Sequence, residues 1–561
     1  MPATAPRIHK LGIGLGHIGS TSKLGTCVRG WAAVSDTSAA RRAICGFTCG
    51  VYDAVAMTFT RSVAWRRVLA AVLLAAPLAA WTQPSPPSRH LLIVVDGLRP
   101  DYVTDAVMPN LTALGKRGVV FAKHHSVYPT VTRVNASSIS TGAYPERHGL
   151  MGNTVFFPKV DPAKFLDTSN RGDLLKIAAA EGQLLTVPTL GQSLQAAGQK
   201  LLVVSSGSGG SAFLNNHTVA GGAILHPQFT LPESLGEDKK ALGPVPADAA
   251  ALDRYAVDAF LKVGLKQDPT VTVLWLGALD DTAHEKGIGA AETVAILRHV
   301  DGEIKRLEDG LRAAGLFATY NIWLTSDHGF TTYTGGIDLA AVLKPHARTL
   351  ADGSPRIVAG GGAIYVRDGD PGTVSAIVSA LQKTTGVGAV FTRAAQPGSL
   401  TGSVPGSLSF EAARWTHDRS AQILFSPDWT DSANSHGWRG SAASNGTAGH
   451  GSTSPWDIHN TLIAAGPDLK RGITIQSPSA NVDFAPTFLK LLNLAVPATM
   501  QGRPLDEGLV RGAAPSAVAV RTMEHVARTA DGSYVVTGMF SVVTAGGQQY
   551  RYLDGTRVLR K

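Results

Sequence analysis

Five apolar stretches rich in Val, Ile and Leu recur along the chain, and each ends in a segment that contains Gly, Asp or Ser. They occupy residues 90–97, 200–207, 271–280, 320–329 and 460–467. Continuous apolar runs of this length are typical of strands buried on both faces, as in a parallel sheet. Helical spacing lies between them, for example in residues 292–315, which end at a glycine suited to closing a helix. This alternation predicts an α/β/α sandwich with a mainly parallel central sheet.

The five stretches lie within residues 88–510, which we expect to form the main domain. Less regular regions near 154–250 and 395–449 are expected to be insertions at the rim of the sheet. Residues 511–561 form a C-terminal extension in which apolar and polar positions alternate around Gly546 and Gly547. That pattern predicts a β-hairpin.

The N-terminal region has the pattern of an export signal that begins well inside the chain. After Met57, a basic segment ends at Arg66 and Arg67, an apolar run fills residues 68–80, and a Pro-rich segment follows. The run is too short for a comfortable transmembrane helix. We therefore expect a signal peptide over residues 57–82, an upstream extension over 1–56 that is not translated, and a periplasmic or secreted mature protein without a membrane anchor.

The positions of the cysteines argue against a protein held by disulfides or thiolate-bound metal. The distribution of charge argues against a protein that binds duplex nucleic acid. All three cysteines precede residue 57, so the exported chain would have neither disulfides nor thiolate metal sites. The formal net charge is +9, but no block of Lys and Arg and no basic-aromatic stripe occurs. We expect a diffusely basic surface that does not bind duplex nucleic acid.

Three of the predicted strands carry a carboxylate at or just after their carboxyl ends: Asp96, Asp280 and Asp327. In open α/β sheets, this is the edge where ligands bind. His284 follows Asp280 by four positions, which places both side chains on one helix face. His328 follows Asp327 directly, and such a pair requires a turn.

A further histidine, His450, lies just before the last apolar stretch, and His436 is its alternative. Three Asp and three His residues suit two borderline divalent cations with mixed nitrogen and oxygen ligands, best Zn²⁺, although Mn²⁺ would also fit. We interpret His124, His125 and His148 as structural or supporting residues.

The segment YPTVTRVNASSISTG, residues 128–142, contains two threonines, Thr130 and Thr132, and a Thr-x-x-Asn step. Such a step either caps a helix or presents a nucleophile above a metal. The local sequence alone leaves both interpretations open.

Five segments in this order, VVDGLRPDY, TRVNASSISTGAYPERHGLMGN, DDTAHEKG, TSDHGF and HGSTSPWD, resemble the alkaline phosphatase superfamily. Within it, they are most similar to the type I phosphodiesterase/nucleotide pyrophosphatase family. The resemblance implies an alkaline phosphatase-like fold, a zinc-dependent phosphoric ester hydrolase and a small-molecule phosphate ester as substrate. It also implies the site residues: Thr132 as nucleophile, Asn153 as a phosphoryl-oxygen ligand, Asp280, His284 and His450 on one zinc, and Asp96, Asp327, His328 and Thr132 on the other.

The charges in this site bear on the substrate. Two Zn²⁺ ions, three carboxylates and a threonine alkoxide sum to zero, which suits a diester monoanion better than a monoester dianion. The Lys-x-Arg pair of the related threonine phosphomonoesterases is missing from the comparable segment, residues 201–213. We therefore expect a phosphodiesterase, with a phosphate monoesterase as the alternative.

Arg133 is a departure from the family pattern, because the nucleotide-cleaving members have an aromatic residue after the threonine. Its side chain either pairs with a phosphoryl oxygen or faces solvent. The first alternative makes Arg133 a substrate-binding residue.

Two rival interpretations remain. SPPSR at residues 85–89 fits a sulfatase maturation pattern but precedes the first predicted strand, where no nucleophile is expected. A non-catalytic binding protein could share the fold, but the full ligand set and the threonine favour an enzyme.

Overall fold

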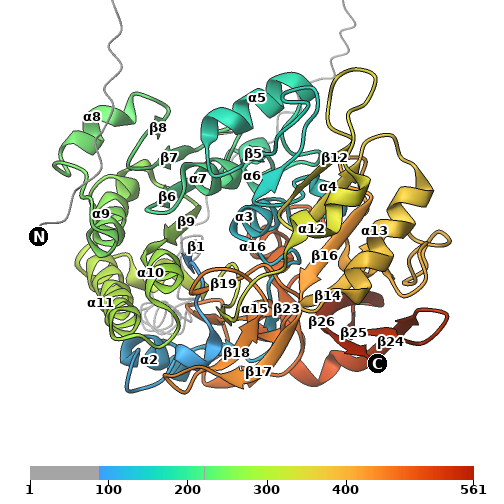
Figure 1. The fold of residues 1–561 in the computed structure, drawn as a ribbon. Coiled ribbons are helices and arrows are strands. Elements are labelled where there is room, and N and C mark those ends of the chain that lie inside the picture. Colours follow the sequence, from blue (N-terminus) through green and yellow to red (C-terminus); the bar gives the residue numbers. More distant parts are fainter. Residues whose placement is uncertain (1–87, 220) are drawn as a thin grey trace, which may run out of the picture. The chain divides into compact units, whose positions relative to one another are not determined.

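All five predicted strands lie in one nine-stranded central sheet of order β22-β2-β21-β10-β1-β9-β6-β7-β8 (Figure 1). The five inner strands β10, β1, β9, β6 and β7 run parallel to one another. The prediction of a mainly parallel sheet is confirmed. The strands are β1 (Arg89–Val95), β2 (Val119–Phe121), β6 (Leu201–Ser205), β7 (Ala223–Leu225), β8 (Thr230–Leu231), β9 (Val271–Leu276), β10 (Tyr320–Thr325), β21 (Leu462–Ala465) and β22 (Ile473–Ile475).

The computed structural model describes residues 88–219 and 221–561, which belong to one compact unit, Gln83–Lys561. The expected signal peptide and the upstream extension lie outside the described residues, as do residues 85–87 of the SPPSR segment. Over the described part of the chain, no helix is both long and apolar enough to cross a membrane.

Side chains of the central strands alternate between two apolar cores, because successive residues of a strand point to opposite faces. In β1, Leu92 and Val94 join one core, whereas Leu91, Ile93 and Val95 join the other, and all five are completely buried. Burial on both faces explains why the strand sequences are continuously apolar.

Helices cover both faces of the sheet and complete the α/β/α sandwich (Figure 1). The helices on the first face are α3 (Thr132–Thr141), α5 (Arg171–Glu181), α6 (Leu190–Ala196), α7 (Gly209–Asn215) and α16 (Phe484–Leu491). On the second face lie α2 (Pro109–Arg117), α9 (Ala249–Lys262), α10 (Ala278–Lys286) and α11 (Ala291–Ala313). Helix α11 is the predicted helix 292–315, and its chain leaves through Gly315 at a φ of 71°.

Strand β21, the last of the predicted strands, runs antiparallel to its neighbours β10 and β2. It follows α15 (Pro455–Ile458) and β20 (His459–Asn460), which lie at the carboxyl edge of the parallel strands. No crossover helix returns the chain to the opposite edge, so β21 starts where its neighbours end. An apolar run alone does not specify this direction.

The region 154–250 is more than a rim insertion. Besides β4 (Thr154–Val155), β5 (Leu166–Asp167) and α8 (Leu235–Lys240), it contains β6, β7 and β8, which form one side of the central sheet. The region 395–449 instead contributes to two smaller sheets beside the main one, of orders β12-β13-β16-β14-β15 and β17-β18-β11-β19.

The first of these smaller sheets has an apolar core of its own around α13 (Pro371–Lys383). The elements are α4 (Pro145–His148), β11 (Thr331–Tyr333), α12 (Leu339–Leu343), β12 (Ile357–Gly360), β13 (Ala363–Val366), β14 (Val387–Thr392), β15 (Leu408–Ser409), α14 (Phe410–Ala413), β16 (Ile423–Pro427), β17 (Trp429–Ala433), β18 (Arg439–Ala442) and β19 (Ala448–Gly449).

The C-terminal region forms a three-stranded antiparallel sheet of β24 (Ala519–Arg528), β25 (Tyr534–Ala545) and β26 (Gln548–Arg560). Strands β25 and β26 form a hairpin whose turn contains Gly546 and Gly547. The sheet packs on the main domain through buried Tyr552 and Val543, and it contacts the short sheet of β3 (His124–His125), β20 and β23 (Ser479–Ala480). This extension is therefore continuous with the main domain.

Candidate active site

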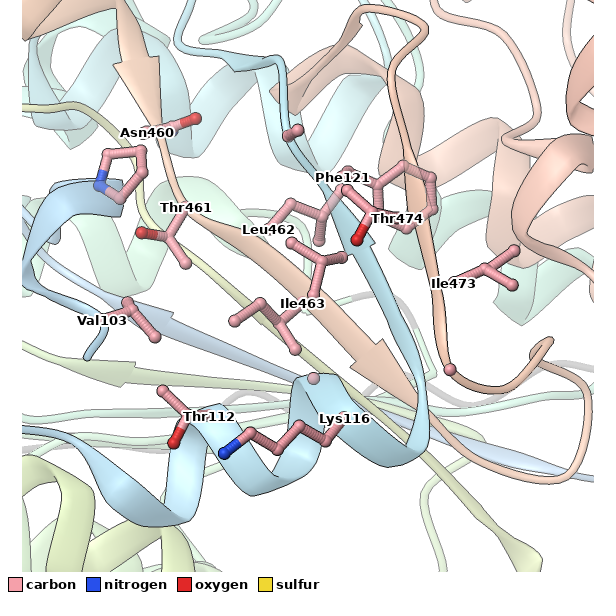
Figure 2. A pocket seen from close by; sticks show the side chains of 15 residues that line it. Val103, Thr112, Lys116, Phe121, Asn460, Thr461, Leu462, Ile463, Ile473 and Thr474 are labelled. Carbon is pink, nitrogen blue, oxygen red and sulfur yellow. The ribbon is translucent and has the colours of Figure 1, made fainter. Parts of the chain in front are cut away.

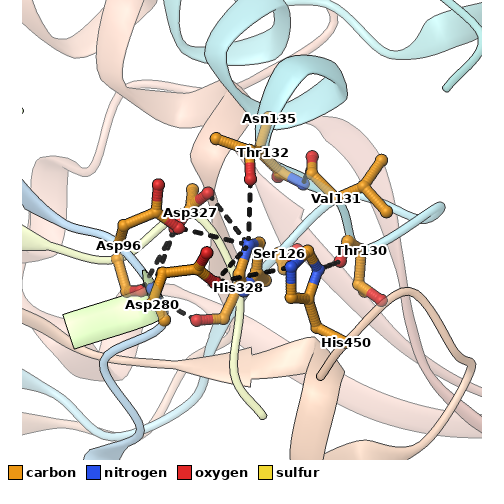
Figure 3. A network of polar contacts seen from close by, with 12 residues as sticks. Asp96, Ser126, Thr130, Val131, Thr132, Asn135, Asp280, Asp327, His328 and His450 are labelled. Atoms are coloured by element: carbon orange, nitrogen blue, oxygen red, sulfur yellow. Dashed lines mark hydrogen bonds and ion pairs between the residues drawn. The ribbon is translucent and has the colours of Figure 1, made fainter. Parts of the chain in front are cut away.

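Three adjacent parallel strands end at the same edge of the sheet and bring three Asp side chains together. Asp96 follows β1 directly, Asp327 lies two residues after β10, and α10, which carries Asp280, begins two residues after β9. The backbone N–H of Gly97 donates to Asp327 Oδ1 at 3.2 Å and fixes the first two strand ends to each other. Figure 3 shows these carboxylates around His328.

The first ligand-type group contains Asp280, His284 and His450. Helix α10 places Asp280 and His284 on one face, with His284 Nε2 at 3.5 Å from Asp280 Oδ1. His450 follows β19, and its Nε2 lies 3.4 Å from the same oxygen. Two histidines from distant parts of the chain therefore converge on one carboxylate.

The second group contains Asp96, Asp327 and His328. His328 Nε2 lies 3.1 Å from Asp327 Oδ2 and 3.3 Å from Asp96 Oδ1. The turn at Gly329 is needed for close packing, because a Cβ atom there would lie 2.0 Å from the carbonyl oxygen of Trp456.

The two groups adjoin each other. His328 Nε2 is 4.0 Å from Asp280 Oδ1, and the rings of His328 and His450 stack with centroids 3.4 Å apart. Neighbouring sites of this kind are typical of proteins that bind two metal ions a few ångströms apart.

Hydrogen bonds to backbone carbonyls fix all three imidazole rings. Nδ1 of His284 faces the carbonyl of Ala448 at 2.9 Å, that of His328 faces Gly329 at 2.9 Å, and that of His450 faces Thr130 at 2.8 Å. A carbonyl only accepts, so Nδ1 of each ring carries a proton and Nε2 points toward the carboxylates. This is the usual orientation of metal-binding histidines.

One oxygen of each Asp is buried without a hydrogen-bond partner: Asp96 Oδ1, Asp280 Oδ1 and Asp327 Oδ2. Burial and the carboxylates of Asp327 and Asp280 raise the pKa of Asp96 well above its usual range. Buried carboxylate oxygens this close together repel one another unless cations lie between them. The residues therefore fit a pair of divalent cations.

Thr132 is the first residue of α3, and its Oγ1 lies 3.3 Å from His328 Nε2. Thr130 has a different environment, because its Oγ1 donates to the carbonyl of Ser452 at 2.9 Å and accepts from the N–H of Gly451 at 3.1 Å. Only Thr132 of this pair presents its hydroxyl to the cluster, whereas Thr130 supports the loop that carries His450.

The side chain of Asn135, the Asn of the Thr-x-x-Asn step, forms hydrogen bonds with backbone groups. Asn135 accepts from the N–H of Val127 at 2.8 Å and donates to the carbonyls of Val127 and Val131. Asn481 donates to Asn135 Oδ1 and to the carbonyl of Asp327, both at 2.9 Å. The start of α3 is thereby fixed to the loop of the second group, a role of Asn481 that no sequence signal indicates.

Asn153 and Arg133 are connected through the start of α3. The backbone N–H of Arg133 donates to Asn153 Oδ1 at 2.9 Å. The Arg133 side chain does not face solvent freely, because its Nε atom is buried. Arg133 as a whole is half-buried, so its role as a substrate-binding residue stays a prediction.

Trp275 is a supporting residue that sequence reasoning missed. Its indole Nε1 donates to Asp96 Oδ2 at 2.9 Å, and both groups are buried. The donation leaves only Asp96 Oδ1 free to face the cluster. Within the sequence, Trp275 is one more apolar residue of a buried strand.

The other histidines have structural partners. His124 contacts Ser479 and Asn481, His148 contacts Ser138, and exposed His436 belongs to neither ligand-type group.

His125, His459 and Asp554 form a third group of possible ligands. However, His125 Nε2 and Asp554 Oδ1 are only 2.8 Å apart, which is a direct hydrogen-bond distance, and Asp554 Oδ2 accepts from Ser541. Because both carboxylate oxygens of Asp554 have hydrogen-bond partners, we interpret this group as a hydrogen-bonded contact between the C-terminal sheet and the core.

A separate hollow lies away from these groups. An apolar groove of about 460 Å³ runs along α2 and β21, lined among others by Lys116, Phe121 and Ile463 (Figure 2). None of its lining residues is a candidate site residue.

A mainly parallel α/β/α sandwich with two His/Asp groups at its carboxyl edge defines a protein of the alkaline phosphatase superfamily. Residues 90–452 match the family described as type I phosphodiesterase / nucleotide pyrophosphatase, and the chain belongs to that family.

The chain is also similar to several curated relatives. It is 28% identical over 247 residues to human ectonucleotide pyrophosphatase/phosphodiesterase family member 1, over 44% of this chain and 24% of that protein. To bovine bis(5'-adenosyl)-triphosphatase it is 27% identical over 274 residues, or 48% of this chain and 54% of the relative. The matched region therefore spans only about a quarter to a half of these relatives.

Among solved structures, murine ectonucleotide pyrophosphatase/phosphodiesterase 5 has a similar fold. Its TM-score is 0.53 at 20% identity, covering 73% of this chain and 96% of that one. A variant of the murine protein described as inactive, with one threonine replaced by alanine, was solved in complex with AMP.

Proposed function

We propose that this protein is an exported, zinc-dependent hydrolase of phosphate diesters or pyrophosphates that works through a phospho-threonine at Thr132. The observation that carries the proposal is the set of three unpartnered carboxylate oxygens and three Nε2 atoms beside the Thr132 hydroxyl. Asp280, His284 and His450 would bind one zinc, and Asp96, Asp327, His328 and Thr132 the other. Family membership supports the reaction class.

Bound cations would lower the pKa of the Thr132 hydroxyl and stabilise negative charge on the phosphoryl group. Thr132 Oγ then forms a bond to phosphorus while the bond to the leaving oxygen breaks. Water attacks the phospho-threonine in the second step, which releases the phosphorylated product and restores the hydroxyl. The position of Thr132 at the N-terminus of α3 favours the anionic states through the dipole of the helix.

Asn153 is oriented for a role as phosphoryl-oxygen ligand. Its Oδ1 accepts from the N–H of Arg133, so its amide nitrogen remains free to donate to the substrate. We infer that Asn153 holds one oxygen of the phosphoryl group.

Charge balance and family membership favour diesters and pyrophosphates, including those of nucleotides, over monoesters. The bovine relative is named as a bis(5'-adenosyl)-triphosphatase. A phosphate monoesterase of the same fold is the second candidate, since Arg133 adds a positive charge beside the site.

The test compares kcat/KM of the zinc-loaded protein for bis(4-nitrophenyl) phosphate and 4-nitrophenyl phosphate. Thr132→Ala should lower kcat/KM for the diester by at least about 1000-fold, because the nucleophile is lost. Bound zinc, measured by mass spectrometry, should remain close to two ions per chain in Thr132→Ala and in the control Thr130→Ser.

The outcomes separate the candidate functions. A preference for the diester that disappears in Thr132→Ala supports the proposal. A preference for the monoester would assign the chain to the phosphatases instead. Zinc bound without hydrolysis of either ester would contradict the proposal and favour a sulfatase or a binding protein.

A further inference from the structure

Arg133 holds a charged side chain beside the candidate nucleophile without a protein partner. Its main chain is fixed at both ends, since its N–H donates to Asn153 and its carbonyl accepts from Ser137 Oγ at 2.9 Å. Its Nε is buried without a hydrogen-bond partner, and within residues 88–219 and 221–561 no hydrogen bond or ion pair engages the guanidinium.

Two buried arginines of this protein have structural roles, because other groups of the protein accept hydrogen bonds from their guanidinium groups. The Arg99 guanidinium donates to Asp101 and to the carbonyls of Phe330 and Arg439. The Arg503 guanidinium donates to Glu507 and to the carbonyl of Pro478. Arg133 is half-buried, and its buried Nε lacks such a partner, which is costly for a charged group, so Arg133 is arranged for an anion that is not part of the protein.

Four carboxylates lie close enough to the Arg133 guanidinium to act on its charge. Burial lowers the pKa of the guanidinium, whereas the carboxylates of Asp96, Asp167, Asp280 and Asp327 raise it. Three of these four are the proposed metal ligands. Once their charge is balanced by cations, the guanidinium still requires an anion at the same place.

We propose that Arg133 binds a non-bridging oxygen of the phosphoryl group that Thr132 attacks. The inference rests on the proposed function and extends it: the substrate is recognised through the charge of its phosphoryl group. Arg133 supplies the one positive charge that balances a phosphodiester monoanion in an otherwise neutral site. A guanidinium and the amide of Asn153 together then hold the phosphoryl group during attack.

Binding of a phosphate anion tests this without requiring turnover. Inorganic phosphate is titrated by calorimetry into the zinc-loaded protein, into Arg133→Gln and Arg133→Lys, and into the control Arg147→Gln. Arg147 is an exposed arginine of the neighbouring helix α4. We expect Arg133→Gln to weaken phosphate binding about 10- to 100-fold, Arg133→Lys to retain part of the affinity, and Arg147→Gln to be unchanged.

Sulfur substitution locates the contact. The two enantiomers of methyl 4-nitrophenyl phosphorothioate place sulfur in one or the other non-bridging position. A guanidinium donates poorly to sulfur, so Arg133→Gln should alter the ratio of the two kcat/KM values, whereas a general loss of structure lowers both equally. The measured zinc content should stay equal to that of the wild type.

The outcomes for Arg133 and for the proposed function are distinct. Phosphate affinity within threefold of the wild type in Arg133→Gln, or an unchanged enantiomer ratio, would overturn the inference even in an active diesterase. Phosphate binding that depends on Arg133 in a protein without hydrolytic activity would support the anion contact and contradict the proposed function. If Arg133→Gln does not fold, Arg133→Lys provides both measurements.

Discussion

At the scale of one residue, a single hydrogen bond from Trp275 orients the carboxylate of Asp96, a candidate metal ligand. The indole N–H occupies Asp96 Oδ2, so the carboxylate cannot rotate and its other oxygen faces His328. Groups that orient metal-binding side chains commonly affect metal affinity by about 10- to 100-fold.

Replacing Trp275 by Phe should therefore weaken metal binding about 10-fold or more while preserving the fold. The measurement is a competition titration of zinc against a chelator, monitored by ion content per chain. Trp323→Phe is the matched control, because its buried indole nitrogen has no hydrogen-bond partner among the described residues. Equal zinc affinities in the two variants would contradict the role of Trp275.

At the scale of elements, the C-terminal sheet completes the main domain. Strand β26 carries Asp554 to buried His125, and Tyr552 donates to Asp483 Oδ2 at 3.1 Å while accepting from Arg503. These contacts attach the sheet to the segment just before α16, on the face of the central sheet that also carries α3.

Asp554→Asn should lower the free energy of unfolding by about 1–3 kcal/mol, because the charge-assisted bond to His125 is lost. Urea denaturation measures this change. Asp531→Asn, in the exposed turn between β24 and β25, should change the stability by much less. If Asp554→Asn also removed one bound metal ion per chain, the third group would be a metal site and our interpretation of it would be wrong.

At the scale of the whole molecule, many histidines are buried in neutral form. Burial lowers the pKa of His90, His217 and His226 to about 4 and that of His124, His148 and His459 to about 3. In the unfolded chain these groups bind protons near pH 6.5, so the unfolded state takes up more protons in acid. Their contribution to stability is complete above pH 6.5 and is lost as the pH falls toward 4 and 3.

We expect the free energy of unfolding to decrease between pH 6.5 and 5 by up to about 1.4 kcal/mol per pH unit for each of these histidines. Urea denaturation at several pH values measures the slope. His148→Asn should reduce the slope, whereas His436→Asn, at an exposed position, should leave it unchanged. A stability independent of pH in this range would contradict the prediction.

The sequence by itself determined the class of fold and the family. Continuous apolar runs identified the central strands because burial on both faces leaves a purely local signal. The Asp residues that follow them could be named for a similar reason: parallel strands place their carboxyl ends at one edge, so strand ends predict proximity. Thr132 was named only from the resemblance to the family.

Only the tertiary structure decided the direction of β21, the addition of β7 and β8 to the central sheet, and the supporting roles of Trp275 and Asn481. It also decided that the guanidinium of Arg133 lies beside the carboxylates without a partner. Each of these features depends on contacts between residues far apart in the chain. Periodicity and spacing report which side chains are buried, but not which distant group a buried polar atom meets.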